Sequence, residues 1–191
     1  MVYNTDLWNS YTEENKEKSQ KELSKFIYHI SLALNAKTIL EGGCNTGNNL
    51  LEFPSNVNVT GVDLNEKAID IARSKFSTFN FKVGSLLKIP FPDSSFDIVF
   101  TRGVLIHIPK KEMEQVVKEL YRVSKKWIFN LEYFGEDSKM ISWKRGDDLL
   151  WYRDMKVWWK NFDVEIVSET EIPEKLDFGK TRFTLVRKNN V

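Results

Sequence analysis

The chain has 191 residues, and its 28 lysines and arginines nearly balance 27 aspartates and glutamates, which leaves a net charge of +1. The length fits a single domain over residues 1–191, and 41% hydrophobic with 29% charged residues excludes a disordered chain. Nucleic acid is not expected as a partner, because proteins that bind it usually carry a strongly basic surface. Cys44 is the single cysteine, so no internal disulfide can form and a cytoplasmic location is expected.

No targeting or membrane segment is expected. The first eighteen residues lack a basic stretch followed by an apolar run, so the sequence predicts no signal peptide. The longest apolar-rich stretch, residues 26–36, is interrupted by polar residues and is shorter than the roughly 20 residues that a membrane span requires. We also expect no metal site.

Helices and strands are predicted to alternate along most of the chain. The N-terminal segment 1–36 is expected to be helical, with one helix over 13–36 that begins after Thr12 as its N-cap. A buried strand over 37–41 then leads into a glycine-rich turn and a short helix that ends before Pro54. The pattern next predicts strands over 57–64, 79–83, 96–101 and 127–133, with helices over 66–76 and 110–125.

This alternation predicts an α/β fold of the Rossmann-like kind, with a mostly parallel sheet and helices on both faces. The pattern changes after Tyr133. Residues 135–161 are rich in Trp, Asp and Arg and are expected to form an insertion with one helix. Two last strands, over 164–169 and 182–186, are expected to add an antiparallel edge to the sheet.

Polar residues follow each of five predicted strands, and ligands of open α/β sheets bind at the carboxyl ends of the strands. Asp63 ends the second strand, 22 positions after Glu41, where a carboxylate can accept both hydroxyls of a ribose. This spacing favours a nucleoside-containing cofactor. The turn after Glu41 matches neither the dinucleotide fingerprint nor a phosphate-binding P-loop, and a tight turn in an unrelated α/β protein remains the alternative.

The segments ILEGGCNTG, VTGVDL and VGSLLKIPFPDSSFDIVFTRGVLIHI resemble, as a set, the motifs of the class I S-adenosylmethionine-dependent methyltransferases over residues 40–133. Asn45 stands where the middle glycine of the first motif is expected. WNSYTEEN, ELYRVSKKWIFNLEYF and WKRGDDLLWYRDM are similar to the narrower group of methylases associated with pseudaminic acid biosynthesis, in which this asparagine is common. The resemblance implies O- or N-methylation of a small molecule, namely a sugar or nucleotide-sugar of a nonulosonic acid or surface polysaccharide pathway.

The same resemblance assigns roles in binding S-adenosylmethionine and its product S-adenosylhomocysteine. The first-motif residues would hold the methionine part, Asp63 the ribose and Leu64 the adenine. Thr101 and Arg102 would lie near the methionine end. The full set of implied cofactor residues is Tyr11, Glu41, Gly42, Gly43, Asn45, Gly47, Asp63, Leu64, Gly84, Ser85, Leu86, Thr101 and Arg102.

The acceptor side is predicted from residue chemistry. His107, just past the fourth strand, is a candidate general base for a hydroxyl acceptor, or else a residue that stabilises a turn. Glu132 and Tyr133 end the fifth strand and are the other catalytic candidates. Arg145, Asp147 and Arg153 in the insertion are candidates for binding an acidic sugar, or else members of an ion-paired surface helix.

Two other functions are also compatible with the sequence. The chain could be a non-catalytic cofactor-binding module, or a methyltransferase that acts on a protein or another small molecule. The expected assembly is a monomer or a homodimer.

Overall fold

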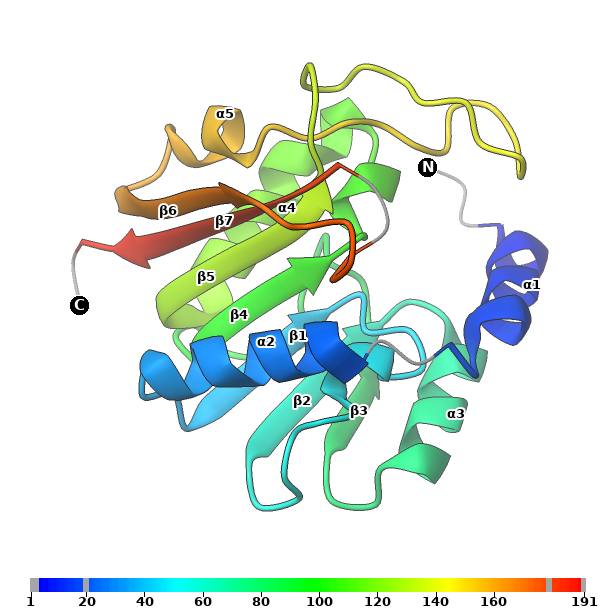
Figure 1. Cartoon of the computed structure of the whole chain (residues 1–191), viewed down its shortest axis with the longest axis horizontal. Helices are drawn as coiled ribbons and strands as arrows, with labels where there is room; N and C mark the ends of the chain where they lie inside the picture. The colour runs from blue at the N-terminus through cyan, green and yellow to red at the C-terminus, as the bar shows by residue number, and fades with distance from the viewer. Residues whose placement is uncertain (1–3, 19–20, 178–179, 190–191) are drawn as a thin grey trace.

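The computed structural model describes residues 4–18, 21–177 and 180–189 (Figure 1). The helices are α1 (Thr5–Asn15), α2 (Lys21–Ala33), α3 (Glu66–Lys75), α4 (Lys110–Val123) and α5 (Met155–Trp159), with short 3-10 turns η1 (Asn48–Leu50) and η2 (Leu105–His107). The strands are β1 (Thr38–Gly42), β2 (Asn58–Asp63), β3 (Asn80–Val83), β4 (Phe96–Arg102), β5 (Ser124–Tyr133), β6 (Val164–Glu171) and β7 (Thr181–Lys188).

The seven strands form one sheet in the order β3-β2-β1-β4-β5-β7-β6. Strands β1 to β5 pair in parallel, and β7 pairs antiparallel with both β5 and β6. This arrangement confirms the predicted Rossmann-like sheet with its antiparallel C-terminal edge. The chain order reverses between β1 and β4, so the switch point of the sheet lies after Gly42, where ligands of such sheets bind.

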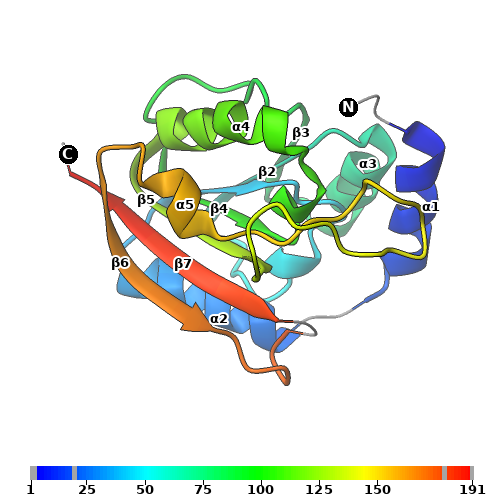
Figure 2. The ribbon, with the colours of Figure 1, turned by 90° about the horizontal axis from the view of Figure 1, so that it is seen from above.

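Helices cover both faces of the sheet (Figure 2). Leu23 and Ile27 of α2 pack with Phe129 of β5 in one core cluster, and Leu120 of α4 packs with Ile128 of β5 in the other. Successive strand residues point to opposite faces, which is why Ile128 and Phe129 enter different clusters. The central strands are therefore buried on both sides, and their carboxyl ends are free to shape a site.

The N-terminal segment differs from the prediction of one helix over 13–36. Two helices form there, and Thr12 is not an N-cap but a fully buried residue inside α1. The N-cap of α1 is Asn4, whose side chain accepts a hydrogen bond from the Leu7 N–H at 3.0 Å. The preference of threonine for capping positions was a weak guide here, because contacts with the rest of the fold determine the position of α1. Helix α1 lies next to α3, away from α2 (Figure 1).

The insertion 135–161 contains one helix, α5, as predicted. The part before α5 is an extended loop with two isolated bridges, Met140 with Trp151 and Trp143 with Gly146. This loop reaches across the top of the sheet toward α1, where the rings of Trp143 and Trp8 come within 6.1 Å of one another between centroids (Figure 2). Among the helices of the described ranges, none is both long and apolar enough to span a membrane.

Candidate cofactor and acceptor site

A cavity of about 260 Å³ opens at the carboxyl ends of β1, β2 and β4. Ten of the residues that the sequence predicts for the site line it. They are Tyr11, Gly43, Asn45, Asp63, Leu64, Gly84, Ser85, Leu86, Arg102 and His107. The structure thus brings together residues that the sequence analysis assigned separately to the cofactor and to the acceptor.

The turn after β1 requires glycine at two positions. Gly43 has φ +71°, and a Cβ there would lie 2.4 Å from a methyl carbon of Val104. Gly47 has φ +76°, and its Cβ would lie 2.8 Å from the ring of Phe76. Both angles are in the left-handed region that favours glycine. Because Gly43 has no side chain, the turn passes close to Val104. Gly43 lines the cavity, whereas Gly42 and Gly47 are buried and do not line it.

Asp63 is held by backbone groups at the end of β2. One carboxylate oxygen accepts the Asn45 N–H and the other accepts the Asn65 N–H, each at 2.8 Å. A carboxylate has about four lone-pair positions, so both oxygens keep acceptor capacity for two ribose hydroxyls. Leu64 follows with 45% of its surface exposed, an apolar face beside that carboxylate. These features fit a nucleoside.

Glu41 lies under the glycine turn rather than in the cavity wall. It is fully buried, and its Oε1 accepts a hydrogen bond from the Asn49 amide at 2.6 Å. Within the part of the chain that the structure describes, its Oε2 is buried without a hydrogen-bond partner. Burial raises the pKa of this carboxyl to about 8. An unpaired buried carboxyl oxygen at this point is suited to a hydrogen bond with a ligand group or an ordered water.

The far wall of the cavity is the loop after β3. Ser85 Oγ accepts the Leu87 N–H at 3.1 Å, which shapes the turn that carries Gly84 and Leu86. Leu86 is buried and faces Gly42, where a Cβ would lie 3.0 Å from its methyl group. Together with Leu64, the residues Gly84, Ser85 and Leu86 of this loop line one wall of the cavity.

Arg102 lines the cavity at the end of β4, but its guanidinium is already paired. Its Nε lies 3.3 Å from Asp177 Oδ2, and a second nitrogen donates to Oδ1 of the same carboxylate. Thr101, its neighbour, is fully buried and does not line the cavity. Its hydroxyl donates to Glu132 Oε1 at 2.8 Å and accepts from the Asn130 amide at 2.9 Å. The structure therefore corrects the assignment of Thr101, which supports the strand ends and does not touch the cofactor cavity.

His107 lies where the acceptor end was expected. Its Nδ1 is 2.6 Å from the carbonyl oxygen of Leu149 in the insertion. Its ring centroid is 5.0 Å from that of Trp8 and 5.0 Å from that of Trp143. Burial lowers the pKa of His107 to about 4. A neutral imidazole with such a low pKa is a weak base, so the geometry favours a hydrogen-bonding role over proton abstraction.

Glu132 and Tyr133 do not face the cavity. Both oxygens of Glu132 accept hydrogen bonds from the β4 region, from Thr101 Oγ1 at 2.8 Å and from the Val104 N–H at 3.1 Å. Glu132 is buried and its pKa is raised by burial to about 7. Tyr133 is half-buried at the end of β5, where its backbone carbonyl accepts the Arg153 N–H at 2.8 Å. Their predicted catalytic roles are not supported by these positions.

The insertion places its charged residues differently from the predicted clamp. Arg153 is buried and donates hydrogen bonds to backbone carbonyls, among them that of Leu105 at 2.8 Å. These bonds join the insertion to η2. Asp147 is exposed and does not line the cavity. Arg145 lies over the rings of Tyr11 and Trp143, at 5.4 and 5.7 Å from their centroids, and pairs with Glu14. Arg153 is thus a structural residue, and Arg145 joins the insertion to α1.

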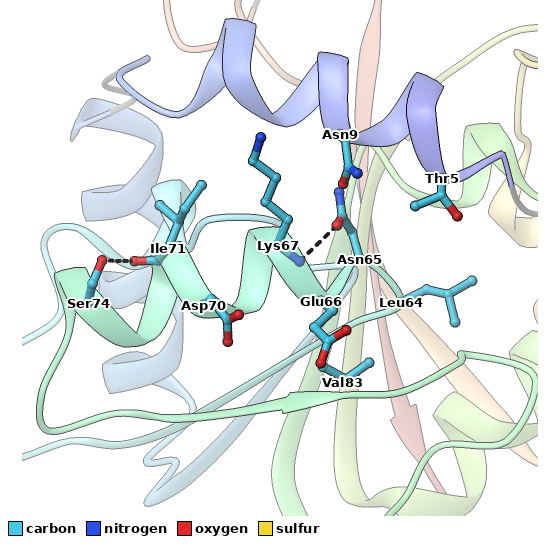
Figure 3. A pocket seen from close by; sticks show the side chains of 10 residues that line it. All are labelled: Thr5, Asn9, Leu64, Asn65, Glu66, Lys67, Asp70, Ile71, Ser74 and Val83. Atoms are coloured by element: carbon cyan, nitrogen blue, oxygen red, sulfur yellow. Dashed lines mark hydrogen bonds between the residues drawn. The ribbon is translucent and has the colours of Figure 1, made fainter.

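Sequence reasoning assigned Tyr11 of α1 to the site but missed Trp8 of the same helix and Asn65. Trp8 lines the cavity beside Tyr11, and Asn65 lines it beside Asp63. A second groove, of about 680 Å³, lies on the outer side between α1 and α3 and shares Leu64 and Asn65 with the cavity (Figure 3). The signal that was available is the aromatic spacing of Trp8 and Tyr11, three residues apart and hence on one helix face. No cluster of potential metal ligands occurs among the residues that the structure covers.

Comparison with known proteins agrees with this geometry. Residues 39–126 match the family model described as a methyltransferase domain. An uncharacterised methyltransferase of Schizosaccharomyces pombe is 32% identical over 112 residues, which cover 51% of this chain and 40% of that protein. The 24-methylenesterol C-methyltransferase 3 of Arabidopsis thaliana is 27% identical over 182 residues, 81% of this chain and 50% of that protein. The chain spans half or less of the length of these curated relatives.

Solved structures share the fold over nearly the whole chain. The magnesium protoporphyrin IX methyltransferase of Synechocystis PCC 6803, solved with bound S-adenosylhomocysteine, superposes with a TM-score of 0.71 at 14% identity and covers 96% of this chain and 94% of that one. Such low identity shows the fold alone. Residues 39–126 therefore resemble a methyltransferase domain, and the chain shares the Rossmann-like fold of this methyltransferase structure.

Proposed function

We propose that this protein transfers a methyl group from S-adenosylmethionine to a small molecule. The observation that carries the proposal is the position of Asp63, whose carboxylate is fixed by two backbone N–H groups at the mouth of a cavity that also reaches His107. The methyltransferase domain over residues 39–126 supports the cofactor. The cavity joins a nucleoside-binding half to an aromatic half, as a two-substrate transfer requires.

S-adenosylmethionine supplies an activated methyl group on a sulfonium, which is already a good leaving group. The chain then has to hold the donor and the acceptor in line at about 3–3.5 Å and to exclude water. The glycine turn and Asp63 serve the first task at the cofactor end. Trp8, Tyr11 and His107 serve the second task, because their rings cover the other end of the cavity.

The acceptor is a ring compound in this proposal. The rings of Trp8, Tyr11, His107 and Trp143 form one contact cluster, referred to here as the aromatic wall. Aromatic faces stack on the C–H face of a sugar or on a planar ring. The narrower sequence resemblance favours a sugar or nucleotide-sugar of a nonulosonic acid or surface polysaccharide pathway. A sterol-like or aromatic acceptor is the alternative, since a relative named as a sterol methyltransferase matches 81% of this chain.

Calorimetry with S-adenosylhomocysteine tests the cofactor, and NAD serves as the control ligand. Incubation with S-adenosylmethionine and a panel of amino sugars, nucleotide sugars, sterols and hydroxylated aromatics tests the acceptor. Detection of a gain of one methyl group by mass spectrometry identifies the substrate class. Binding of the cofactor with no methylation across the panel would favour a non-catalytic cofactor-binding module. A monomeric or homodimeric assembly and a cytoplasmic location remain predictions.

A further inference from the structure

One buried side chain of α1 is hydrogen-bonded to both loops that shape the nucleoside end of the cavity. The hydroxyl of Thr12 accepts the Asn45 amide at 3.3 Å and the Asn65 amide at 3.1 Å. Asn45 belongs to the turn after β1, and Asn65 caps α3. Thr12 has no exposed surface. Two loops that meet at Asp63 therefore share a single acceptor on the N-terminal helix.

The orientation of both amides is fixed by other bonds. Asn45 Oδ1 accepts the Thr46 N–H at 2.8 Å, and Asn65 Oδ1 accepts the Lys67 N–H at 3.1 Å (Figure 3). Each side-chain oxygen is thus occupied, so each NH₂ group must face Thr12. The backbone N–H groups of the same two asparagines hold Asp63. The carboxylate expected to bind the ribose and the helix that covers it are supported by the same pair of residues.

Helix α1 is held by polar contacts as well as by the ring contacts of Trp8 and Tyr11. Thr12 is the buried residue of this helix. Its C-terminal end is docked by Asn48, whose amide donates to the Asn15 carbonyl at 2.9 Å. At the surface, Glu13 pairs with Lys67 of α3 at 2.7 Å. The two hydrogen bonds to Thr12 lie at the most buried point of this helix, so they contribute to its docking.

Helix α1 covers part of the cavity. Small-molecule sites usually offer about 300–1,000 Å³, whereas this cavity holds about 260 Å³ with α1 in place. Trp8 and Tyr11 line the cavity from α1. Opening of α1 would break the bonds between Thr12 and the two asparagines.

We propose that Thr12, Asn45 and Asn65 form a latch that closes α1 over the bound cofactor and positions the aromatic wall for the acceptor. Asn45 replaces the motif glycine because its amide reaches Thr12, and it is a positioning residue. Because α1 closes after the cofactor has bound, the cofactor binds first and the acceptor binds second. The proposal rests on S-adenosylmethionine as the cofactor.

The test compares Thr12→Val, which keeps the shape and removes the acceptor, with Thr12→Ser, which keeps the hydroxyl. Dissociation of S-adenosylhomocysteine is followed by stopped-flow fluorescence, and hydrogen exchange of the α1 amides is measured in the ligand-free protein. We expect Thr12→Val to dissociate about tenfold faster and to lose α1 protection, since two hydrogen bonds are lost. Thr12→Ser should stay within about twofold of the unmodified protein. Thr184→Val, a buried threonine of β7, is the matched control and should change neither quantity.

Asn45→Gly provides the second arm, because it removes one donor of the latch and relieves a positive φ of 45°. In the double variant with Thr12→Val, the dissociation rate should rise by less than the product of the two single fold-changes, because both substitutions break the same hydrogen bond. A folded Thr12→Val protein with unchanged dissociation and unchanged α1 exchange overturns the latch. If the unmodified protein binds no S-adenosylhomocysteine, the cofactor assignment fails, and the exchange arm alone then decides whether the latch holds α1.

Discussion

The Nδ1 atom of His107 lies 2.6 Å from the carbonyl oxygen of Leu149, a contact between residues 42 positions apart. Because a carbonyl can only accept, Nδ1 carries the proton and Nε2 keeps its lone pair in the neutral ring. The contact joins the η2 turn to the insertion, and the ring is packed between Trp8 and Trp143. His107 is therefore a junction between three segments that together form the aromatic wall.

This geometry gives a prediction that separates a general base from a hydrogen-bonding residue. Asparagine at position 107 can donate to the Leu149 carbonyl and also offers an acceptor oxygen. Because the pKa of His107 is lowered to about 4, we expect His107→Asn to keep kcat within about tenfold of the unmodified enzyme, while His107→Ala loses more. The measurement is steady-state kinetics on the identified acceptor. An equal loss of about 10²–10⁴ in both variants would establish His107 as the base instead.

Two glycines with positive φ separate the cost of a steric clash from the cost of a left-handed backbone. A Cβ on Gly43 would lie 2.4 Å from Val104, whereas a Cβ on Gly103, at φ +60°, would meet nothing within 4 Å. Gly103→Ala should cost about 1–2 kcal/mol of unfolding free energy, the left-handed backbone penalty. Gly43→Ala should cost more and also weaken binding of S-adenosylhomocysteine, because Val104 or the turn must shift. Urea denaturation and calorimetry check this, and equal costs would mean that the turn adjusts freely.

The cofactor half of the site was predictable from sequence because local rules determine it. Glycines that precede a helix and an acid at a strand end need no knowledge of distant contacts, and Gly43 and Asp63 both line the cavity. Leu64, which also lines it, was assigned through the family resemblance. The alternation of strands and helices predicted the sheet, although its pairings join residues such as Ile39 and Ile98 that are far apart in the chain.

The acceptor half was less predictable because long-range contacts determine it. Arg153 looked like a ligand for acids, yet it satisfies backbone carbonyls of the η2 region 45 or more positions earlier. Thr12 looked like an N-cap, yet it bonds to Asn45 and Asn65, which lie 33 and 53 positions away. Side-chain type alone does not distinguish a buried structural arginine from a binding one. Only the tertiary arrangement shows which carbonyls need a donor.

Asp63 is the residue whose loss should affect the cofactor most directly. Asp63→Ala should weaken binding of S-adenosylhomocysteine by about 1.5–3 kcal/mol, the range for hydrogen bonds to a charged group. It also leaves the N–H groups of Asn45 and Asn65 without their acceptor, so the unfolding free energy should fall as well. Asp63→Asn retains one carbonyl oxygen and should show a smaller loss of both. Unchanged calorimetric affinity in Asp63→Ala would place the ribose elsewhere.

Glu132 should make the stability of the protein depend on pH. Burial raises its pKa to about 7 in the folded protein, against an ordinary value of 4.5. Between these values the folded state binds more protons than the unfolded chain, so the unfolding free energy falls as the pH rises from about 4.5 through about 7. A difference of this size corresponds to about 3 kcal/mol. Glu132→Gln cannot ionise and should lose this part of the pH dependence, as measured by urea denaturation at pH 5 and pH 8.

The control for Glu132→Gln is Glu174→Gln, which removes a carboxylate from an exposed position after β6. The pKa of Glu41 is raised to about 8, so this carboxyl also makes the unfolding free energy fall as the pH rises, over a wider pH range. The Glu132→Gln variant should therefore show a weaker dependence of the unfolding free energy on pH, but not a complete loss of it. Because Glu132 accepts the Val104 N–H beside the His107 turn, Glu132→Gln should also raise the acceptor KM. A Glu132→Gln protein with the same pH slope as the unmodified chain would show that this carboxyl ionises normally inside the fold.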